Sequence, residues 1–188
     1  MTSSHPEARL TTDVTAKNAR ILVPVLLGAM VTVAMGVYGA NHRGKSIVFH
    51  VSGFENLVVA KSWLTVAATV FAIVQGVSAL VMYGRVKGVT APSWIGGLHR
   101  WSGRAAFFLA VPVAVFCLYG IGFQHHTPRV LVHSLLGCLF FGFFTVKMLV
   151  LTRRGVAGWV LPVLGGLAFA TLVGLSLTSA VWYFTTHG

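Results

Sequence analysis

Five apolar segments, each about as long as the ~20 residues that cross the hydrocarbon core of a bilayer, dominate this chain. They cover approximately residues 21–39, 62–83, 105–124, 130–151 and 158–184, and none of them contains Asp or Glu. A segment in lipid must satisfy its own backbone hydrogen bonds, so a segment of this kind forms a helix. The sequence therefore predicts an all-α, polytopic membrane helix bundle with five transmembrane helices.

All the basic residues except Lys147, which lies near the inner end of the fourth apolar segment, lie outside these segments and predict how the chain is oriented. The chain has 14 Lys and Arg but only 3 Asp and Glu, a balance that in a soluble protein would suggest nucleic acid. Here the basic residues instead indicate orientation and contact with anionic lipids, and we expect no nucleic acid partner. Placing the N-terminus inside and the C-terminus outside puts nine basic residues on the inner side, against four outside: Arg9, Lys17, Arg20, Arg85, Lys87, Arg100, Arg104, Arg153 and Arg154 inside; Arg43, Lys45, Lys61 and Arg129 outside.

The polar N-terminus and the apolar remainder predict a simple domain organisation. Residues 1–18 lack apolar periodicity and are expected to form a flexible cytoplasmic tail. Residues 19–188 are expected to form a single five-helix transmembrane domain. The longest connection, about 40–61, is too short to fold as a separate unit.

Two helix openings repeat one pattern of histidine and glycine. The stretches are His99-Arg-Trp-Ser-Gly103 and His133-Ser-Leu-Leu-Gly137. Residues four apart share a helix face, so each imidazole lies one turn from a residue without a side chain. Imidazole is a common axial ligand of haem, and bare backbone leaves room for a flat ring. The pattern favours haem b, although glycine also serves helix packing and histidine at a membrane edge also meets water.

The two histidines belong to different sites. Their helices are antiparallel, and about 20 residues at ~1.5 Å each place them roughly 30 Å apart. For His133 we expect His50 as the partner across a haem near the outer face, with His125 or His126 as alternatives. His99 has no second inner histidine that favours a haem, so it is expected to meet lipid phosphate, a propionate or a quinone headgroup together with Arg100 and Arg104.

Two other functions fit the same residues. Imidazoles bind copper and zinc well, so an outer-face metal site is the first alternative, with His50, His125, His126 and His133 as ligands. The second is a cofactor-free subunit that stabilises or recruits a larger membrane complex. Small residues recur every four positions and predict close helix packing, at Gly28, Thr32 and Gly36, and at Gly166, Ala170 and Gly174. Cys117 and Cys138 are expected to be free thiols in the packing.

The histidine-bearing stretches also carry a family resemblance. His99-Arg100-Trp101-Ser102-Gly103-Arg104 and Val132-His133-Ser134-Leu135-Leu136-Gly137 resemble the helix openings of the cytochrome b561 superfamily. The whole chain is similar to an uncharacterised actinobacterial family of multi-pass membrane proteins, most strongly from Leu98 to Arg154. The resemblance implies a bacterial plasma-membrane cytochrome of the b type. Such a protein passes electrons from a quinol or a periplasmic donor to a partner.

Overall fold

A computed structural model describes residues 6–42 and 57–187 of the chain, with side chains from Arg20 onward. This part of the chain is helical. In chain order its elements are α1 Pro6–Asn41, α2 Leu57–Met82, α3 Ile95–Phe116, the π-helical segment η1 Cys117–Ile121, α4 Pro128–Leu151, α5 Val160–Ser176, the π-helical segment η2 Leu177–Val181, and α6 Trp182–His187.

The five predicted membrane-spanning helices are confirmed by length and apolarity. The spans are Arg20–Asn41, Leu57–Met82, Ile95–Ile121, Pro128–Leu151 and Val160–His187. α3 begins at Ile95 rather than near residue 105. Its first turns, which contain His99, Arg100 and Arg104, are therefore also helical. α1 begins at Pro6 and so runs through most of the segment 1–18 expected to be a flexible tail. The flexibility of that segment and the sidedness of the termini stay predictions.

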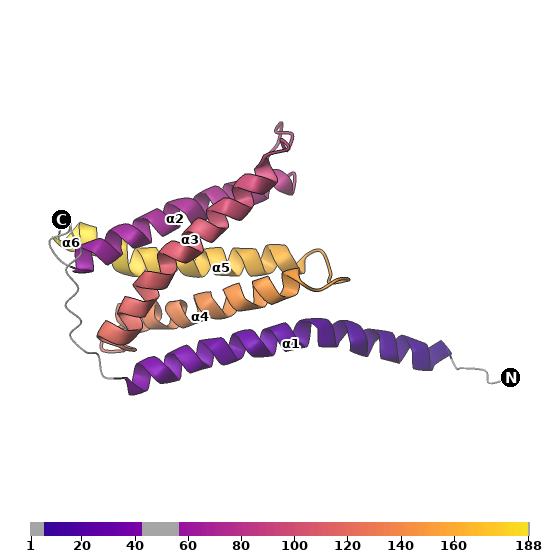
Figure 1. The fold of residues 1–188 in the computed structure, drawn as a ribbon, viewed down its shortest axis with the longest axis horizontal. Helices are drawn as coiled ribbons and strands as arrows, with labels where there is room; N and C mark the ends of the chain where they lie inside the picture. The colour runs from indigo at the N-terminus through magenta and orange to yellow at the C-terminus, as the bar shows by residue number, and fades with distance from the viewer. Residues whose placement is uncertain (1–5, 43–56, 188) are drawn as a thin grey trace.

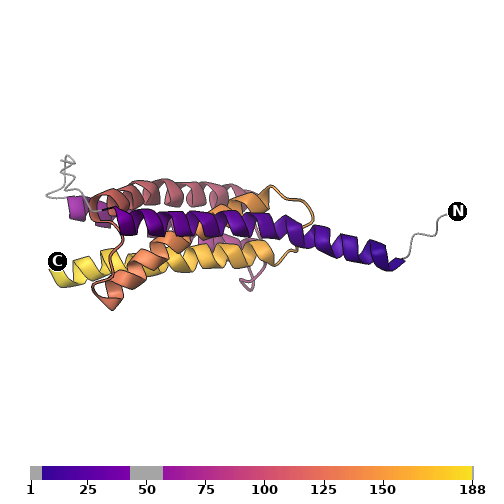
Figure 2. The same ribbon diagram turned by 90° about the horizontal axis from the view of Figure 1, so that it is seen from below.

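The helices pack in an order that differs from their order in the chain. α1 contacts α4, α4 contacts α5, α5 contacts α2, and α2 contacts α3. Figure 1 shows α1 along the lower edge, α4 and α5 in the middle and α2 above them, while α3 runs diagonally from the upper end of α2 toward the end of α1. The start of α1 extends beyond the rest of the bundle, as Figure 2 shows. α4 and α5 therefore have neighbours on both sides.

The predicted small-residue face of α1 packs closely on α4. A Cβ at Gly28 would lie 2.7 Å from the carbonyl oxygen of Gly142, and a Cβ at Gly142 would lie 2.9 Å from that of Gly28. A Cβ at Gly142 would also overlap the hydroxyl of Thr32. At Gly36 the nearest atom of α4 is Cys138 Sγ, 3.9 Å from the Cβ position. Absent side chains thus let the two backbones approach, as in other membrane helix pairs.

The second small-residue face, on α5, is only partly as predicted. A Cβ at Gly174 would lie 2.7 Å from Leu136 Cδ1 of α4, so this glycine is in the packing. Gly166 and Ala170 are exposed, and the prediction that they pack against a neighbour is wrong for this chain by itself. The reason is that a different side of α5 faces α4 and α2. The buried residues of α5 lie on that side: Val160, Ala168, Thr171, Leu172 and Ser176.

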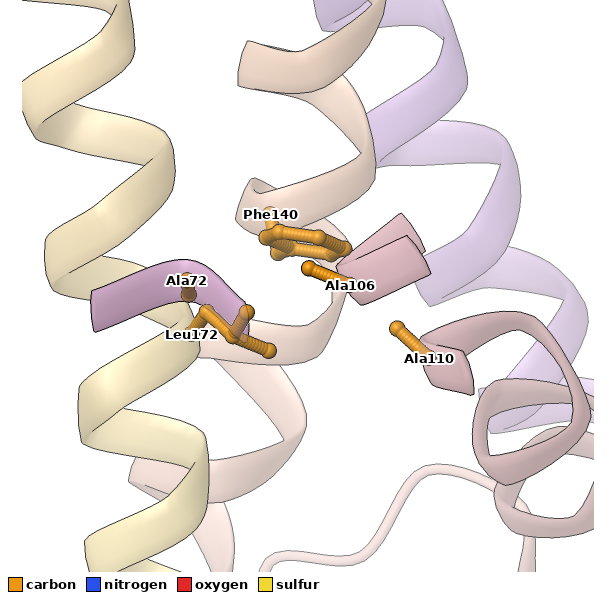
Figure 3. Packing of buried hydrophobic residues seen from close by; sticks show 5 residues of the cluster. All are labelled: Ala72, Ala106, Ala110, Phe140 and Leu172. Atoms are coloured by element: carbon orange, nitrogen blue, oxygen red, sulfur yellow. The ribbon is translucent and has the colours of Figure 1, made fainter. Parts of the chain in front are cut away.

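An interior of alanines and one large ring joins four helices. Ala72, Ala106 and Ala110 surround the Phe140 ring together with Leu172 (Figure 3). Further phenylalanines of α3 and α4 extend this packing: the rings of Phe107 and Phe144 are stacked, with centroids 4.0 Å apart and planes 10° apart. This interior lies between the two histidine-bearing ends of the bundle and fixes the relative positions of α3 and α4.

Candidate functional site at the His133 end of the bundle

The start of α4 places His133 on a well-defined helical turn. Thr127 is the N-cap residue, its side chain accepts a hydrogen bond from the backbone N–H of Val130 at 3.3 Å, and Pro128 follows it. A Thr cap followed by Pro is a typical helix beginning. Ser134 ties the preceding loop to the helix, because its hydroxyl donates to the Gln124 carbonyl at 3.0 Å. The orientation of His133 is therefore set by local structure.

His133 lines a cavity of about 270 Å³, which we call the His133 cavity. Its wall is mostly apolar and includes Gly137, the predicted bare position one turn along α4. Four basic or imidazole side chains also line it: Lys61, His126, Arg129 and His133. None of the described lining residues is acidic. An apolar cavity with several cationic groups suits an amphiphilic anion.

A threonine of η2 contacts the imidazole of His133. The Thr178 hydroxyl lies 2.8 Å from the Gly174 carbonyl, which is the usual bond of a helical threonine to the preceding turn. His133 Nδ1 lies 3.0 Å from the same hydroxyl oxygen. With the threonine proton on the Gly174 carbonyl, Nδ1 is the donor, and in the other tautomer Nδ1 accepts that proton. In the first arrangement the neutral imidazole carries its lone pair on Nε2, the state in which histidine binds a metal or accepts a hydrogen bond.

Arg129 and Lys61 are held beside the cavity by different helices. Arg129 Nη1 donates to the Thr178 carbonyl at 2.6 Å, and its guanidinium lies 3.6 Å from the centroid of the Trp182 ring. The Lys61 ammonium, from α2, lies 5.4 Å from the centroid of the Phe116 ring. These contacts leave both positive charges without an acidic partner among the described residues. An anionic ligand is the natural counterion for such a pair.

Both π-helical segments end at this cavity. Cys117, Leu118 and Ile121 of η1 line it, and so do Thr178 and Ser179 of η2. Gly122 ends η1 with a φ of 76°, and its N–H donates to the Cys117 carbonyl at 2.8 Å. π-helical turns are rare and occur frequently at functional sites, because they rotate side chains out of the regular helical positions. Their coincidence at one cavity marks this end of the bundle as the candidate site.

The His99 pattern serves another purpose in the structure. His99 Nδ1 lies 3.0 Å from the Gln75 carbonyl and 3.1 Å from Ser78 Oγ, so the imidazole joins α3 to α2. The space beside Gly103 is filled by the amide group of Gln75, which a Cβ at Gly103 would overlap. By contrast, the nearest atom to a Cβ at Gly137 is Leu175 Cδ2, at 3.9 Å. The position beside Gly137 is thus open, whereas the position beside Gly103 is occupied by Gln75.

The remaining predicted residues are distributed as follows. His50 lies outside the described residues, His126 lines the cavity, and His125 is exposed away from its lining. No three His, Cys, Asp or Glu side chains within residues 6–42 and 57–187 come together as a metal-binding group. Cys117 and Cys138 are free and both line the cavity. Arg100 and Arg104 are exposed in the first half of α3 and do not line the His133 cavity.

Sequence reasoning missed three contributors to this site. Lys61 and Arg129 were interpreted only as orientation signals, and Thr178 was not singled out. They come from α2, the first turn of α4 and η2, so no local motif links them to His133. Lys61 and Arg129 each lie one residue before an apolar segment, so the sequence does not distinguish them from other cations at the ends of membrane helices.

The comparisons with known proteins identify a family without assigning a role. Residues 21–188 match the model of a family of unknown function, DUF6529, and the chain belongs to that family. No curated protein matches the chain. No solved structure matches it either.

Proposed function

We propose that this member of a family of unknown function is a membrane electron carrier that holds one haem b in the His133 cavity. The observation that carries the proposal is the imidazole of His133 at the cavity wall, whose Nδ1 lies 3.0 Å from the Thr178 hydroxyl; with Nδ1 as the donor, Nε2 would be the ligand atom. Metal-binding histidines usually donate their other ring N–H in this way. When bound, haem supplies reversible one-electron transfer at its iron.

The donor set agrees with the chemistry of haem. His133 would be an axial ligand, Gly137 leaves room beside it, and the apolar wall suits the porphyrin ring. Lys61 and Arg129 would pair with the two propionates. The second axial ligand would be His50 or His126. The volume of about 270 Å³ lies just below the ~300–1,000 Å³ of typical ligand pockets, so haem entry requires the cavity to widen. The π-helical turns are the elements best suited to such a rearrangement.

The bacterial setting of the proposal follows from the resemblance to the actinobacterial family, and its redox role from the resemblance to the cytochrome b561 superfamily. The protein would reside in a bacterial plasma membrane, in an actinobacterium, with the cavity near the outer face. A quinol or a periplasmic protein would deliver electrons there, and a membrane partner would accept them. The side chains around the cavity would keep water from the ring.

The test is a visible spectrum of the protein purified in mild detergent, reduced minus oxidised. We expect the bands of a low-spin b-type haem, and we expect His133→Ala to lose most of the absorbance per mole of protein. His125→Ala is the matched control, because His125 is an exposed histidine just before α4 and does not line the cavity. His50→Ala should reduce the absorbance or change the spin state. Full haem content in the His133 variant, with loss in the His99→Ala variant, would place the cofactor at the opposite end.

A second candidate is a cofactor-free subunit of a larger membrane complex. The observation in its favour is the exposed pair Gly166 and Ala170 on α5, which leaves a small-residue face without a neighbouring helix. A colourless preparation that contains stoichiometric partner polypeptides would support this role. Metal analysis of the same preparation tests the copper or zinc alternative.

A further inference from the structure

We propose that the outward face of α3 at the His99 end binds the headgroup of an anionic phospholipid through Arg100, Trp101 and Arg104. Arg100, Arg104 and Phe108 follow one another at intervals of four positions, and Trp101 lies three before Arg104, so all four lie on one side of the helix. All four are exposed; Trp101 retains 68% of its accessible surface and Phe108 71%. They lie in the span Ile95–Ile121, which is long and apolar enough to cross a membrane, so we expect this face to meet lipid.

The depth of Arg104 gives the site its driving force. Arg104 follows Ile95, the first residue of α3, by about 14 Å of helix at ~1.5 Å per residue. Trp94 and Trp159, exposed at 62% and 66%, precede α3 and α5 at this end and mark the membrane interface. An arginine deeper than the interface that faces lipid requires a polar partner.

The protein itself offers Arg104 only an aromatic contact. Its guanidinium lies 5.1 Å from the centroid of the Trp101 ring, and no hydrogen bond or ion pair involves it within the described part of the chain. The chain has no acidic residue after Glu55, so none of α2 to α6 supplies a carboxylate. The N–H donors of Arg104 are therefore available to a ligand that comes from the membrane.

Phospholipid phosphate is the ligand that this geometry fits. Guanidinium binds phosphate with two parallel hydrogen bonds, and the Trp101 ring, which lies 5.1 Å from the Arg104 guanidinium, holds that group in place. Arg100 lies one turn nearer the helix start, and its Nη1 is 3.5 Å from the Cβ position of Gly96, so it folds back toward the interface. Nothing lies within 4 Å of the Cβ position of Gly97, which leaves space for the headgroup. Two positive charges without a carboxylate favour a net negative lipid over a zwitterionic one.

Native mass spectrometry of the purified full chain tests this site independently of any haem. Phosphatidylglycerol and phosphatidylcholine with identical acyl chains are titrated separately. We expect tighter binding of phosphatidylglycerol, about fivefold weaker binding in Arg104→Gln, and a smaller loss in Arg100→Gln. Arg104→Lys keeps the charge but loses the bidentate geometry, so it should fall between wild type and Arg104→Gln. Arg153→Gln, in the loop after α4, is the control and should bind as wild type does.

Inorganic phosphate distinguishes a lipid site from a general phosphate site. At millimolar concentration it should leave phosphatidylglycerol bound, because the free ion lacks the acyl chains that lie along Phe108. Equal affinity for the two lipids would overturn the proposal. So would unchanged phosphatidylglycerol binding in Arg104→Gln, or complete displacement by inorganic phosphate.

Discussion

His99 and His133 show that one spacing of histidine and glycine produces two different surroundings. At His99 the imidazole donates to the Gln75 carbonyl of α2, and the Gln75 amide occupies the space beside Gly103. At His133 the imidazole Nδ1 lies 3.0 Å from the Thr178 hydroxyl at the wall of a cavity. The sequence predicts the position of both histidines on their helices. It does not predict which glycine stays uncovered, because the covering side chain comes from another helix.

The role assigned to Thr178 leads to a prediction at this scale. Thr178→Val keeps the shape of the side chain but removes the hydrogen-bond partner of His133 Nδ1, so the arrangement with Nε2 as the ligand atom is no longer favoured. Loss of such a partner typically costs ~10–100-fold in metal affinity. We expect that loss when apoprotein is titrated with haem and followed by its Soret absorbance. Thr178→Ser should bind nearly as wild type, and equal affinity in the Val variant would show that Thr178 has no positioning role.

At the scale of elements, hydropathy predicts the membrane spans, and small-residue spacing predicts one of the contacts between helices. The five spans follow from apolar length, because a bilayer accepts little else. The α1–α4 contact follows from Gly28, Thr32 and Gly36, whose small side chains allow close backbones. The same spacing on α5 does not predict packing at Gly166, because helix order in the bundle decides which face is covered. The π-helical segments have no comparable sequence signal.

The two glycine environments give a matched pair of variants. Gly142→Ala places a methyl group against Thr32 and the Gly28 carbonyl, and overpacking of this kind costs ~1–3 kcal/mol. Gly166→Ala adds the same methyl group where nothing lies within 4 Å. We expect a lower unfolding temperature in detergent for the Gly142 variant alone, measured by circular dichroism. Equal unfolding temperatures for the two variants would show that α1 and α4 are less closely packed than described.

Over the whole molecule, the distribution of charge is the most general feature. The chain carries a formal net charge of +11, and its three acidic residues, Glu7, Asp13 and Glu55, all precede α2. The bundle from α2 onward therefore has cations at both ends and no internal carboxylate to neutralise them. We expect anionic ligands and lipids to act as counterions, at the His133 cavity and on α3 respectively.

The same distribution predicts the topology. Nine basic residues on the inner side against four on the outer favour an N-terminus inside the cell. In intact cells, a cysteine introduced as Thr185→Cys should react with a membrane-impermeant maleimide, whereas Ser3→Cys should react only after the cells are permeabilised. The unsubstituted chain, with Cys117 and Cys138, supplies the background. Labelling of Ser3→Cys alone in intact cells would reverse the assignment.

The π-helical segments also determine how the chain responds to changes in its length. A π-helical turn contains about one residue more than an α-helical turn, and one residue corresponds to ~100° of helical rotation. Removing a single residue from Leu177–Val181 would convert that turn to α-helix with almost the same total rotation, because the π turn already accommodates the extra residue. Trp182 would then keep the Arg129 guanidinium that it now contacts at 3.6 Å. Removing one residue from the regular helix α5 would instead rotate α6 and Trp182 by ~100°, so the π-helical segment is the place where this end of the bundle tolerates a change in length.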